Sequence, residues 1–221
     1  MRNYSAFDII GPVMVGPSSS HTAGAARLGK IAKLIAGVEI KHVQFMLHGS
    51  FAQTWKGHGT DKALVAGILG MDPWDARLKD SLEMAAKQGI GVEFSSIDLG
   101  DVSPNTVKIV VTGIDGVVTT VVGSSIGGGN VVVIQVDGDD TEFTGTYPTL
   151  LVHHTDMPGM ILKVCEVLYA RKVNIVSLKV FRSARAADAS MVFELDEALT
   201  EREIEAIREI PNIKNAKAIN L

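Results

Sequence analysis

The chain has 221 residues, of which 46% are hydrophobic and 21% charged, and this composition fits one large or two small globular domains. Its formal net charge of −4 argues against binding to nucleic acid or to an anionic membrane surface, because either role needs a basic patch. Without a run of 18 apolar residues or a secretory apolar segment, we expect a cytoplasmic protein that does not span a membrane.

A single cysteine, Cys165, limits the redox and metal chemistry of the chain. One thiol cannot form an internal disulfide, and it cannot hold an iron–sulfur cluster, which normally takes several thiolates. Cys165 also falls in a helical apolar pattern with Ile161, Val164 and Leu168, which favours a buried, unreactive side chain. We therefore expect no metal site here, and any metal must come from another polypeptide.

After a short apolar segment at residues 6–10, the most informative stretch is the polar run at residues 16–24, which contains Ser18, Ser19, Ser20, His21 and Thr22. Buried hydroxyls need partners and disfavour helix interiors, so we predict a loop. A helix follows from residue 25, with one serine as its N-cap. The remaining hydroxyls and the imidazole would then face one point that suits a carboxylate or phosphate. The alternative is an ordinary helix cap beside a histidine with no special role.

A second polar cluster follows a buried strand predicted at residues 43–47. The strand ends at His48-Gly49-Ser50, and the cluster occupies residues 55–61, where glycines flank His58. Thr60 or Asp61 is expected to cap a helix at residues 62–69. Because binding groups gather on loops at one end of a scaffold, we predict that the two clusters meet in space. The alternative is two unrelated surface turns.

The following segment begins with Asp72, predicted to cap a helix that has Pro73 at its first position and ends at Gly89. A short strand at 92–94 and three strands at 107–112, 117–122 and 131–136 follow. The turn at residues 124–130 is either a nest of N–H groups for an anion or a flexible hairpin loop; its candidate ligands are Ser125, Gly127, Gly128 and Gly129. The acidic run at residues 137–140 is interpreted as a solvated turn.

From residue 147 the pattern changes to strand, helix, strand, strand, helix and strand. Thr200 and Glu203 form a predicted capping box for the second helix. The predicted elements lie at residues 150–153, 160–168, 173–180, 189–195, 200–207 and 213–219. This order indicates a ferredoxin-like βαββαβ unit, so the fold class is α+β, with an N-terminal α/β domain at 1–146 and this unit at 147–221. His153 and His154 are expected to be structural, and His42 to lie on the surface.

The D-x-P-G turn made by Asp156, Pro158 and Gly159 within this unit resembles that of ACT domains. The resemblance implies a regulatory module that often binds an amino acid at a subunit interface beside this turn. By analogy, Asn174 and Ile175 would help to line the effector site. ACT domains can also serve only to pair subunits, and that alternative stays open.

The first 146 residues resemble the β subunit of iron–sulfur L-serine dehydratases. The motifs that carry the resemblance are G-P-S-S-S-H-T-A-G at 16–24, H-G-S-F-A at 48–52, G-H-G-T-D at 57–61 and S-I-G-G-G at 125–129. The resemblance implies a lyase of amino-acid catabolism and gluconeogenesis that converts L-serine to pyruvate and ammonia. It also implies that a partner α subunit holds a 4Fe–4S cluster, whose iron would act as a Lewis acid, and that this chain is inactive alone. The N-terminal part also resembles the allosteric substrate-binding domain of some phosphoglycerate dehydrogenases.

Such an active site needs donors for the substrate carboxylate and a group that moves a proton. His21 and His58 are the candidate catalytic residues, for proton transfer or for orienting the carboxylate. Asp61 could orient His58, although a helix cap is the preferred role. The candidate substrate-binding residues are Ser18, Ser19, Ser20, Thr22, Ser50, Thr60 and Asp61.

A hydrolase and a sensing module are the alternatives to a lyase subunit. A hydrolase is disfavoured because no G-x-S-x-G motif is present. The alternative is a non-catalytic module that senses an amino acid or anion and dimerises. A homodimer through either domain is expected.

Overall fold

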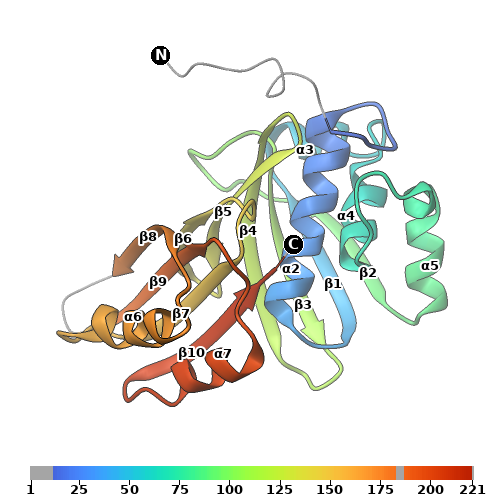
Figure 1. Ribbon diagram of the computed structural model, residues 1–221. Coiled ribbons are helices and arrows are strands. Elements are labelled where there is room, and N and C mark those ends of the chain that lie inside the picture. Colours follow the sequence, from blue (N-terminus) through green and yellow to red (C-terminus); the bar gives the residue numbers. More distant parts are fainter. Residues whose placement is uncertain (1–11, 183–186, 221) are drawn as a thin grey trace. The chain divides into compact units, whose positions relative to one another are not determined.

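The computed structural model describes residues 12–182 and 187–220, and it confirms the expected α+β fold (Figure 1). The chain divides into two compact units between Val133 and Ile134. The apolar segment at residues 6–10 lies outside the described residues. The domain boundary expected at 146/147 stays a prediction.

A mixed six-stranded sheet contains all the described strands of the first unit. Its strands are β1 Ile40–Leu47, β2 Gly91–Ser96, β3 Thr106–Gly113, β4 Val118–Gly127, β5 Asn130–Val136 and β6 Asp139–Phe143. Their order is β2-β1-β3-β4-β5-β6, and the sheet runs past the unit boundary within β5. Strand β1 pairs parallel with β2 and antiparallel with β3, and β3 pairs antiparallel with β4. The buried positions of β1 and β3 alternate along each strand, as expected for strands that place alternate side chains in a core.

The helices of the first unit are η1 Ser19–Gly24, α2 Ala25–Ala36, α3 Gly49–Thr54, α4 Thr60–Ile68, η2 Ala76–Asp80 and α5 Ser81–Lys87. Helix α2 lies along β3 and β4 and packs against α4 (Figure 1). The two helices approach closely at Gly29 and Gly67, because a Cβ atom on Gly67 would lie 2.1 Å from the Ala26 carbonyl oxygen. The polar segments that precede α2 and α4 are also joined, since the Thr22 hydroxyl donates to the His58 carbonyl oxygen at 3.4 Å.

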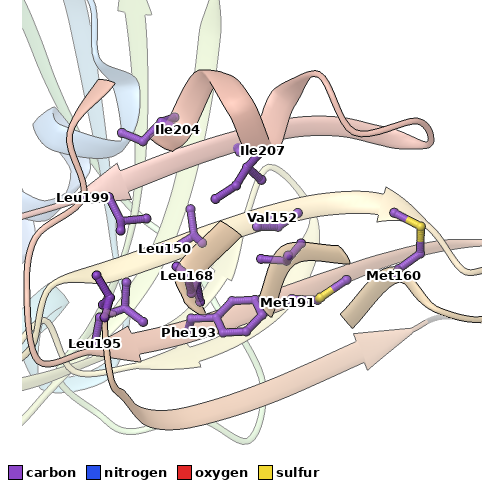
Figure 2. Close-up of a cluster of buried hydrophobic side chains, with 13 residues drawn as sticks. Leu150, Val152, Met160, Leu168, Met191, Phe193, Leu195, Leu199, Ile204 and Ile207 are labelled. Carbon is purple, nitrogen blue, oxygen red and sulfur yellow. The ribbon is translucent and has the colours of Figure 1, made fainter. Parts of the chain in front are cut away.

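The second unit contains the predicted βαββαβ order. Its elements are β7 Thr149–Thr155, α6 Met160–Ala170, β8 Ile175–Arg182, β9 Asp188–Leu195, α7 Glu201–Arg208 and β10 Ile213–Ile219. The antiparallel sheet has the order β10-β7-β9-β8. Figure 2 shows the core, in which Leu150 and Phe193 of the sheet pack with Leu168 of α6 and Ile207 of α7. The capping box of Thr200 and Glu203 is confirmed at the start of α7.

The hydroxyl-rich run is helical, so the predicted loop is wrong. Ser19–Gly24 form a π-helical turn that continues into α2, and Ser18 is its N-cap, accepting from the His21 N–H at 3.2 Å. A serine is therefore an N-cap, as expected, but of the π-helical turn; the N-cap of α2 itself is Gly24, which has no side chain to bond. Small residues at the end of the run make this turn possible, because a Cβ on Gly24 would lie 2.2 Å from Ser125 Oγ. Short π-helical turns are rare and often occur at functional sites.

Helix α4 begins without a side-chain cap, so the predicted capping by Thr60 or Asp61 is wrong. The N-cap is Gly59, whose φ of 67° lies in the left-handed region that glycine adopts without strain. Thr60 is consequently the first helical residue and Asp61 lies in the first turn.

The next helix also begins later than predicted. Asp75, rather than Asp72, is the N-cap of η2, and its carboxylate accepts from the Arg77 N–H at 2.9 Å. The Asp72 carboxylate is engaged elsewhere, because it forms an ion pair with Lys30 at 2.7 Å. Pro73 therefore lies in a turn before the helix.

Two predicted turns are shorter than expected, because part of each belongs to a strand. Strand β4 extends through Gly127 and includes Ser124 and Ser125, so only Gly128 and Gly129 reverse the chain. Only the first half of the acidic run is a turn, since Asp139 and Asp140 belong to β6. In both cases the pairing of neighbouring backbone groups outweighs a local turn preference. The strand predicted at 43–47 is confirmed within β1, and α3 begins two residues after its end, at Gly49 with a φ of 55°.

Candidate functional site

The two polar clusters meet, as the sequence predicts. The ring centroids of His21 and His58 are 4.7 Å apart, with the rings tilted by 51°. The Ser18 hydroxyl oxygen lies 3.4 Å from His21 Nδ1, and the Ser50 hydroxyl oxygen lies 3.3 Å from His21 Nε2. Residues from η1, α3 and the loop before α4 thus form one cluster of two imidazoles and two hydroxyls.

Ser18, Ser50 and Phe51 contact His21. Its backbone N–H is capped by Ser18, and its ring makes an edge contact with Phe51 at a centroid distance of 5.2 Å. The hydroxyls that contact the ring belong to Ser18 and Ser50, whereas Ser19 and Ser20 lie half-buried on the same helical turn. The His21 side chain is therefore fixed in orientation.

The electrostatic surroundings keep the His21 imidazole neutral. Burial lowers the pKa of His21 below its ordinary value of 6.5, and the nearby His58 lowers the pKa further. A hydrogen bond with the Ser50 backbone acts in the opposite direction but is the smaller effect. At neutral pH one ring nitrogen of His21 therefore donates and the other accepts.

Several buried polar atoms in and beside this cluster have no hydrogen-bond partner among the described residues. They are His58 Nδ1, Thr60 Oγ1, Asp61 Oδ1, Asn105 Oδ1 and Ser125 Oγ. Buried polar atoms in folded proteins are almost always paired. These atoms are therefore free to bond to water, a ligand or a partner chain.

Asn105 belongs to this set, although the sequence analysis missed it. Its backbone carbonyl oxygen accepts from the Ser125 N–H at 2.9 Å, and the preceding residue, Pro104, packs against Gly49. Asn105 therefore lies between β4 and the start of α3, which carries Ser50. The residue is a single asparagine outside any motif, so only the fold could reveal its position.

The glycine-rich turn after β4 is fastened to the start of α2. Gly127, Gly128 and Gly129 all have positive φ, and the Gly129 carbonyl oxygen accepts from the Arg27 guanidinium at 2.9 Å. Ser125 lies against Gly24 at the end of η1. Ser125 therefore lies next to the His21 segment, and its role as an anion ligand stays a prediction.

The predicted effector residues of the second unit occupy the turn before α6 and the start of β8. Asp156 accepts from the Arg182 guanidinium at 3.3 Å, and Gly159, with a φ of 88°, is the N-cap of α6. Asn174 donates to the Asp196 carboxylate at 2.8 Å, and Ile175 packs against the core. Effector binding by these residues stays a prediction.

The described residues do not fit an iron–sulfur cluster. Among residues 12–182 and 187–220, no group of three or more His, Cys, Asp or Glu side chains could hold a metal ion. Cys165 packs against the core of the second unit, and burial raises the pKa of its thiol, which disfavours the thiolate that a cluster needs. In the same part of the chain, no helix is long and apolar enough to cross a membrane.

Two family models match separate parts of the chain. The family model "Serine dehydratase beta chain" matches residues 5–91, and the model "ACT domain" matches residues 148–212. The L-serine dehydratase beta chain of Peptoniphilus asaccharolyticus is 42% identical over 222 residues, which cover the full length of both chains. The chain belongs to the family of L-serine dehydratase beta chains.

Two further relatives extend the comparison of this L-serine dehydratase beta chain. A "probable L-serine dehydratase, beta chain" of Bacillus subtilis (strain 168) is 40% identical over 213 residues, or 96% of each chain. A D-3-phosphoglycerate dehydrogenase of Methanocaldococcus jannaschii is 38% identical over 90 residues, which are 41% of this chain and 17% of that enzyme. The beta chain is thus a subunit of L-serine ammonia-lyase, and both candidate histidines lie in the segment matched by the serine dehydratase model.

Proposed function

We propose that this beta chain supplies His21 and His58 to an active site shared with a cysteine-bearing α subunit, and that the complete enzyme converts L-serine to pyruvate and ammonia. The observation that carries the proposal is the 4.7 Å approach of two imidazoles that come from different segments. The 4Fe–4S cluster is assigned to the α subunit, because the described residues of this chain offer no ligand set for it.

The hydroxyls of the cluster are proposed to bind the substrate carboxylate. Ser18 and Ser50 already flank His21, and Thr60 has a buried hydroxyl without a partner among the described residues. A hydroxyl can turn its proton toward a carboxylate oxygen, and bonds to charged groups are the stronger ones. The other proposed substrate-binding residues are Ser19, Ser20, Thr22 and Asp61.

His58 is proposed to move the proton, and His21 to be a positioning residue. Both ring nitrogens of His21 have a hydroxyl neighbour, whereas His58 Nδ1 has none among the described residues. Elimination of water breaks the Cα–H and Cβ–O bonds of serine, and the resulting enamine becomes an imine that water converts to pyruvate and ammonia. For the first of these steps, this chain can supply the base that accepts the Cα proton.

The test is an anaerobic pyruvate assay on the beta chain purified together with its α subunit. His58→Ala is expected to lower kcat by about 10²–10⁴-fold with a smaller change in KM, since this is the usual contribution of acid–base catalysis. His21→Ala is expected to alter the pH profile as well as kcat. His42→Ala is the matched control, because His42 is a histidine outside the cluster, with Nε2 3.3 Å from Glu93 Oε1 on the neighbouring edge strand β2. Unchanged kcat and KM in both cluster variants would exclude the proposal.

Calorimetry with L-serine on the beta chain alone examines the alternative of a sensing module. Tight binding without the α subunit would favour sensing over catalysis. The shared active site instead predicts weak binding to the lone chain, because the α subunit would supply the rest of the site.

Regulation and pairing are proposed for the second unit, with the ACT domain taken as residues 147–221 after a catalytic domain at 1–146. Asp156, Pro158 and Gly159, with Asn174 and Ile175, would line an effector site between two copies. Support for a homodimer comes from β8, an edge strand that exposes apolar side chains: Val176, Leu178 and Val180. Light scattering on Leu178→Lys tests this, and an unchanged dimer would exclude pairing through β8.

A further inference from the structure

The second unit contains a cavity of about 350 Å³ that the proposed active site does not use. It lies on the face of the ACT sheet opposite to the packed core. Val152 of β7 points into that core, so His153 points to the other face, where Asn215 of β10 and Ser190 of β9 stand directly opposite it in register. Strand β6 covers this row of side chains, since Asp139 Oδ2 is 2.7 Å from His153 Nδ1. All lining residues belong to the second unit.

The lining is richer in carboxylates than in cations. Asp137, Asp139 and Asp188 contribute acidic groups, whereas Lys217 is the only lysine or arginine among the described lining residues. His153 lies between two of the carboxylates, with Nε2 3.4 Å from Asp188 Oδ2. Lys214 also pairs with Asp188 and lowers the pKa of its carboxyl, which keeps this side of the cavity ionised. A cationic group is the complement of such a lining.

One buried hydroxyl in the lining has no partner. Thr141 is only 6% exposed, and its Oγ1 makes no hydrogen bond with any described residue. Leaving a buried hydroxyl unpaired costs about 1–3 kcal/mol. Thr141 lies two residues after Asp139 on β6, so both side chains point to the same face of that strand. A donor bound beside Asp139 would satisfy this hydroxyl.

We propose that this cavity binds a small molecule with a primary ammonium group on a compact aliphatic body. The ammonium group would sit between Asp139, Asp188 and Thr141, against a wall formed in part by the apolar residues Val136 and Leu151. Ligand cavities typically have volumes of about 300–1,000 Å³, so this cavity suits a compact molecule. The site lies on the helix-free face of the sheet and shares no lining residue with the D-x-P-G turn. It does not depend on the proposed function of the first unit.

A free amine and an amino acid both supply this chemistry, and the test separates them. Calorimetry on the full beta chain would use propylamine and L-alanine as probes, with propionate as the control that lacks the ammonium group. Binding of propylamine indicates that the proposed contacts to the ammonium group suffice for binding. Binding of L-alanine alone indicates that Lys217 and Asn215 must also hold a carboxylate. Both outcomes support the site, whereas binding of neither probe at millimolar concentration overturns it.

Two substitutions in the lining test whether the probes bind in this cavity. Asp139→Asn and Thr141→Val are each expected to weaken binding about tenfold, the usual effect of losing a hydrogen bond to a charged group. Asp140→Asn is the matched control, because it removes the same charge from an exposed neighbour that does not line the cavity. Thr141→Val should leave the melting temperature unchanged or raise it, since it removes an unpaired hydroxyl, so a folding defect is distinguishable from lost binding. Equal affinity in both variants and the control would overturn the proposal.

Discussion

The close approach of α2 and α4 gives a sharp prediction for Gly67→Ala. These two helices follow the segments that carry His21 and His58, so their separation helps to set the distance between the two imidazoles. A Cβ on residue 67 would lie 2.1 Å from the Ala26 carbonyl oxygen and 2.8 Å from Gly29 Cα. Both are backbone atoms, which cannot turn away as a flexible side chain can.

The size of the effect follows from this overlap. Restoring an ordinary contact of about 3.5 Å requires the helices to separate by roughly 1 Å or more. Overpacking of this kind costs about 1–3 kcal/mol, and the better helix propensity of alanine at residue 67 returns up to about 1 kcal/mol. We expect a net destabilisation of about 1–2 kcal/mol, which lowers the melting temperature by about 2–8 °C for a chain of this size.

Thermal unfolding measures the loss, and pyruvate formation with the α subunit measures the effect on the site. Gly57→Ala is the stability control, because its Cβ would find its nearest neighbour, the Thr54 carbonyl oxygen, at 3.7 Å. A shift of about 1 Å in catalytic geometry can cost about 10²-fold in rate, so Gly67→Ala should also lose activity. A Gly67→Ala protein as stable as wild type would refute the reasoning, since the propensity gain would then outweigh the supposed clash.

Three further predictions concern stability. The pKa of His21 in the folded chain lies below 6.5, so the unfolded chain binds a proton at His21 first as the pH falls. The contribution of the neutral His21 to the free energy of unfolding is therefore fully present above pH 6.5 and is lost as the pH falls toward the folded-state pKa. Urea unfolding of His21→Gln should consequently show a smaller loss of stability between pH 7 and 5 than unfolding of the wild type. Phe193→Ala removes a fully buried ring from the ACT core and should cost about 3–5 kcal/mol in urea unfolding of the second unit, and a loss under 1 kcal/mol would contradict the packing. Thr200→Ala removes the capping box of α7 and should cost about 1 kcal/mol, with Thr144→Ala as the exposed control.

The sequence predicted the second unit well because its elements carry local signals. The capping box at Thr200, the D-x-P-G turn and the alternation along the strands act over a few residues. The first unit was harder, because long-range contacts decide its details. The π-helical turn at Ser19–Gly24 depends on Gly24 meeting Ser125, about a hundred residues later in the chain. Likewise, Asp72 does not cap a helix because it pairs with Lys30, which no local pattern indicates.

The candidate site shows the same division between local and long-range information. His21 and His58 were found from their neighbouring hydroxyls and glycines, which is a local signal. Asn105 was missed because its significance comes only from its place between β4 and the start of α3. The cavity under β6 was missed for a related reason. The acidic run at 137–140 was interpreted as a solvated turn, whereas the pairing of β6 turns Asp139 toward His153.

Most of the buried polar atoms without a partner among the described residues lie in the first unit. Five of the seven buried side-chain atoms without a partner among the described residues belong to His58, Thr60, Asp61, Asn105 and Ser125. At about 1–3 kcal/mol each, leaving all five unpaired would cost about as much as the whole free energy of unfolding of a typical domain. Such a cost is tolerable only if water, substrate or another chain supplies the missing hydrogen bonds. On the proposed function, substrate and the α subunit would supply some of these hydrogen bonds around the two histidines, and water the others.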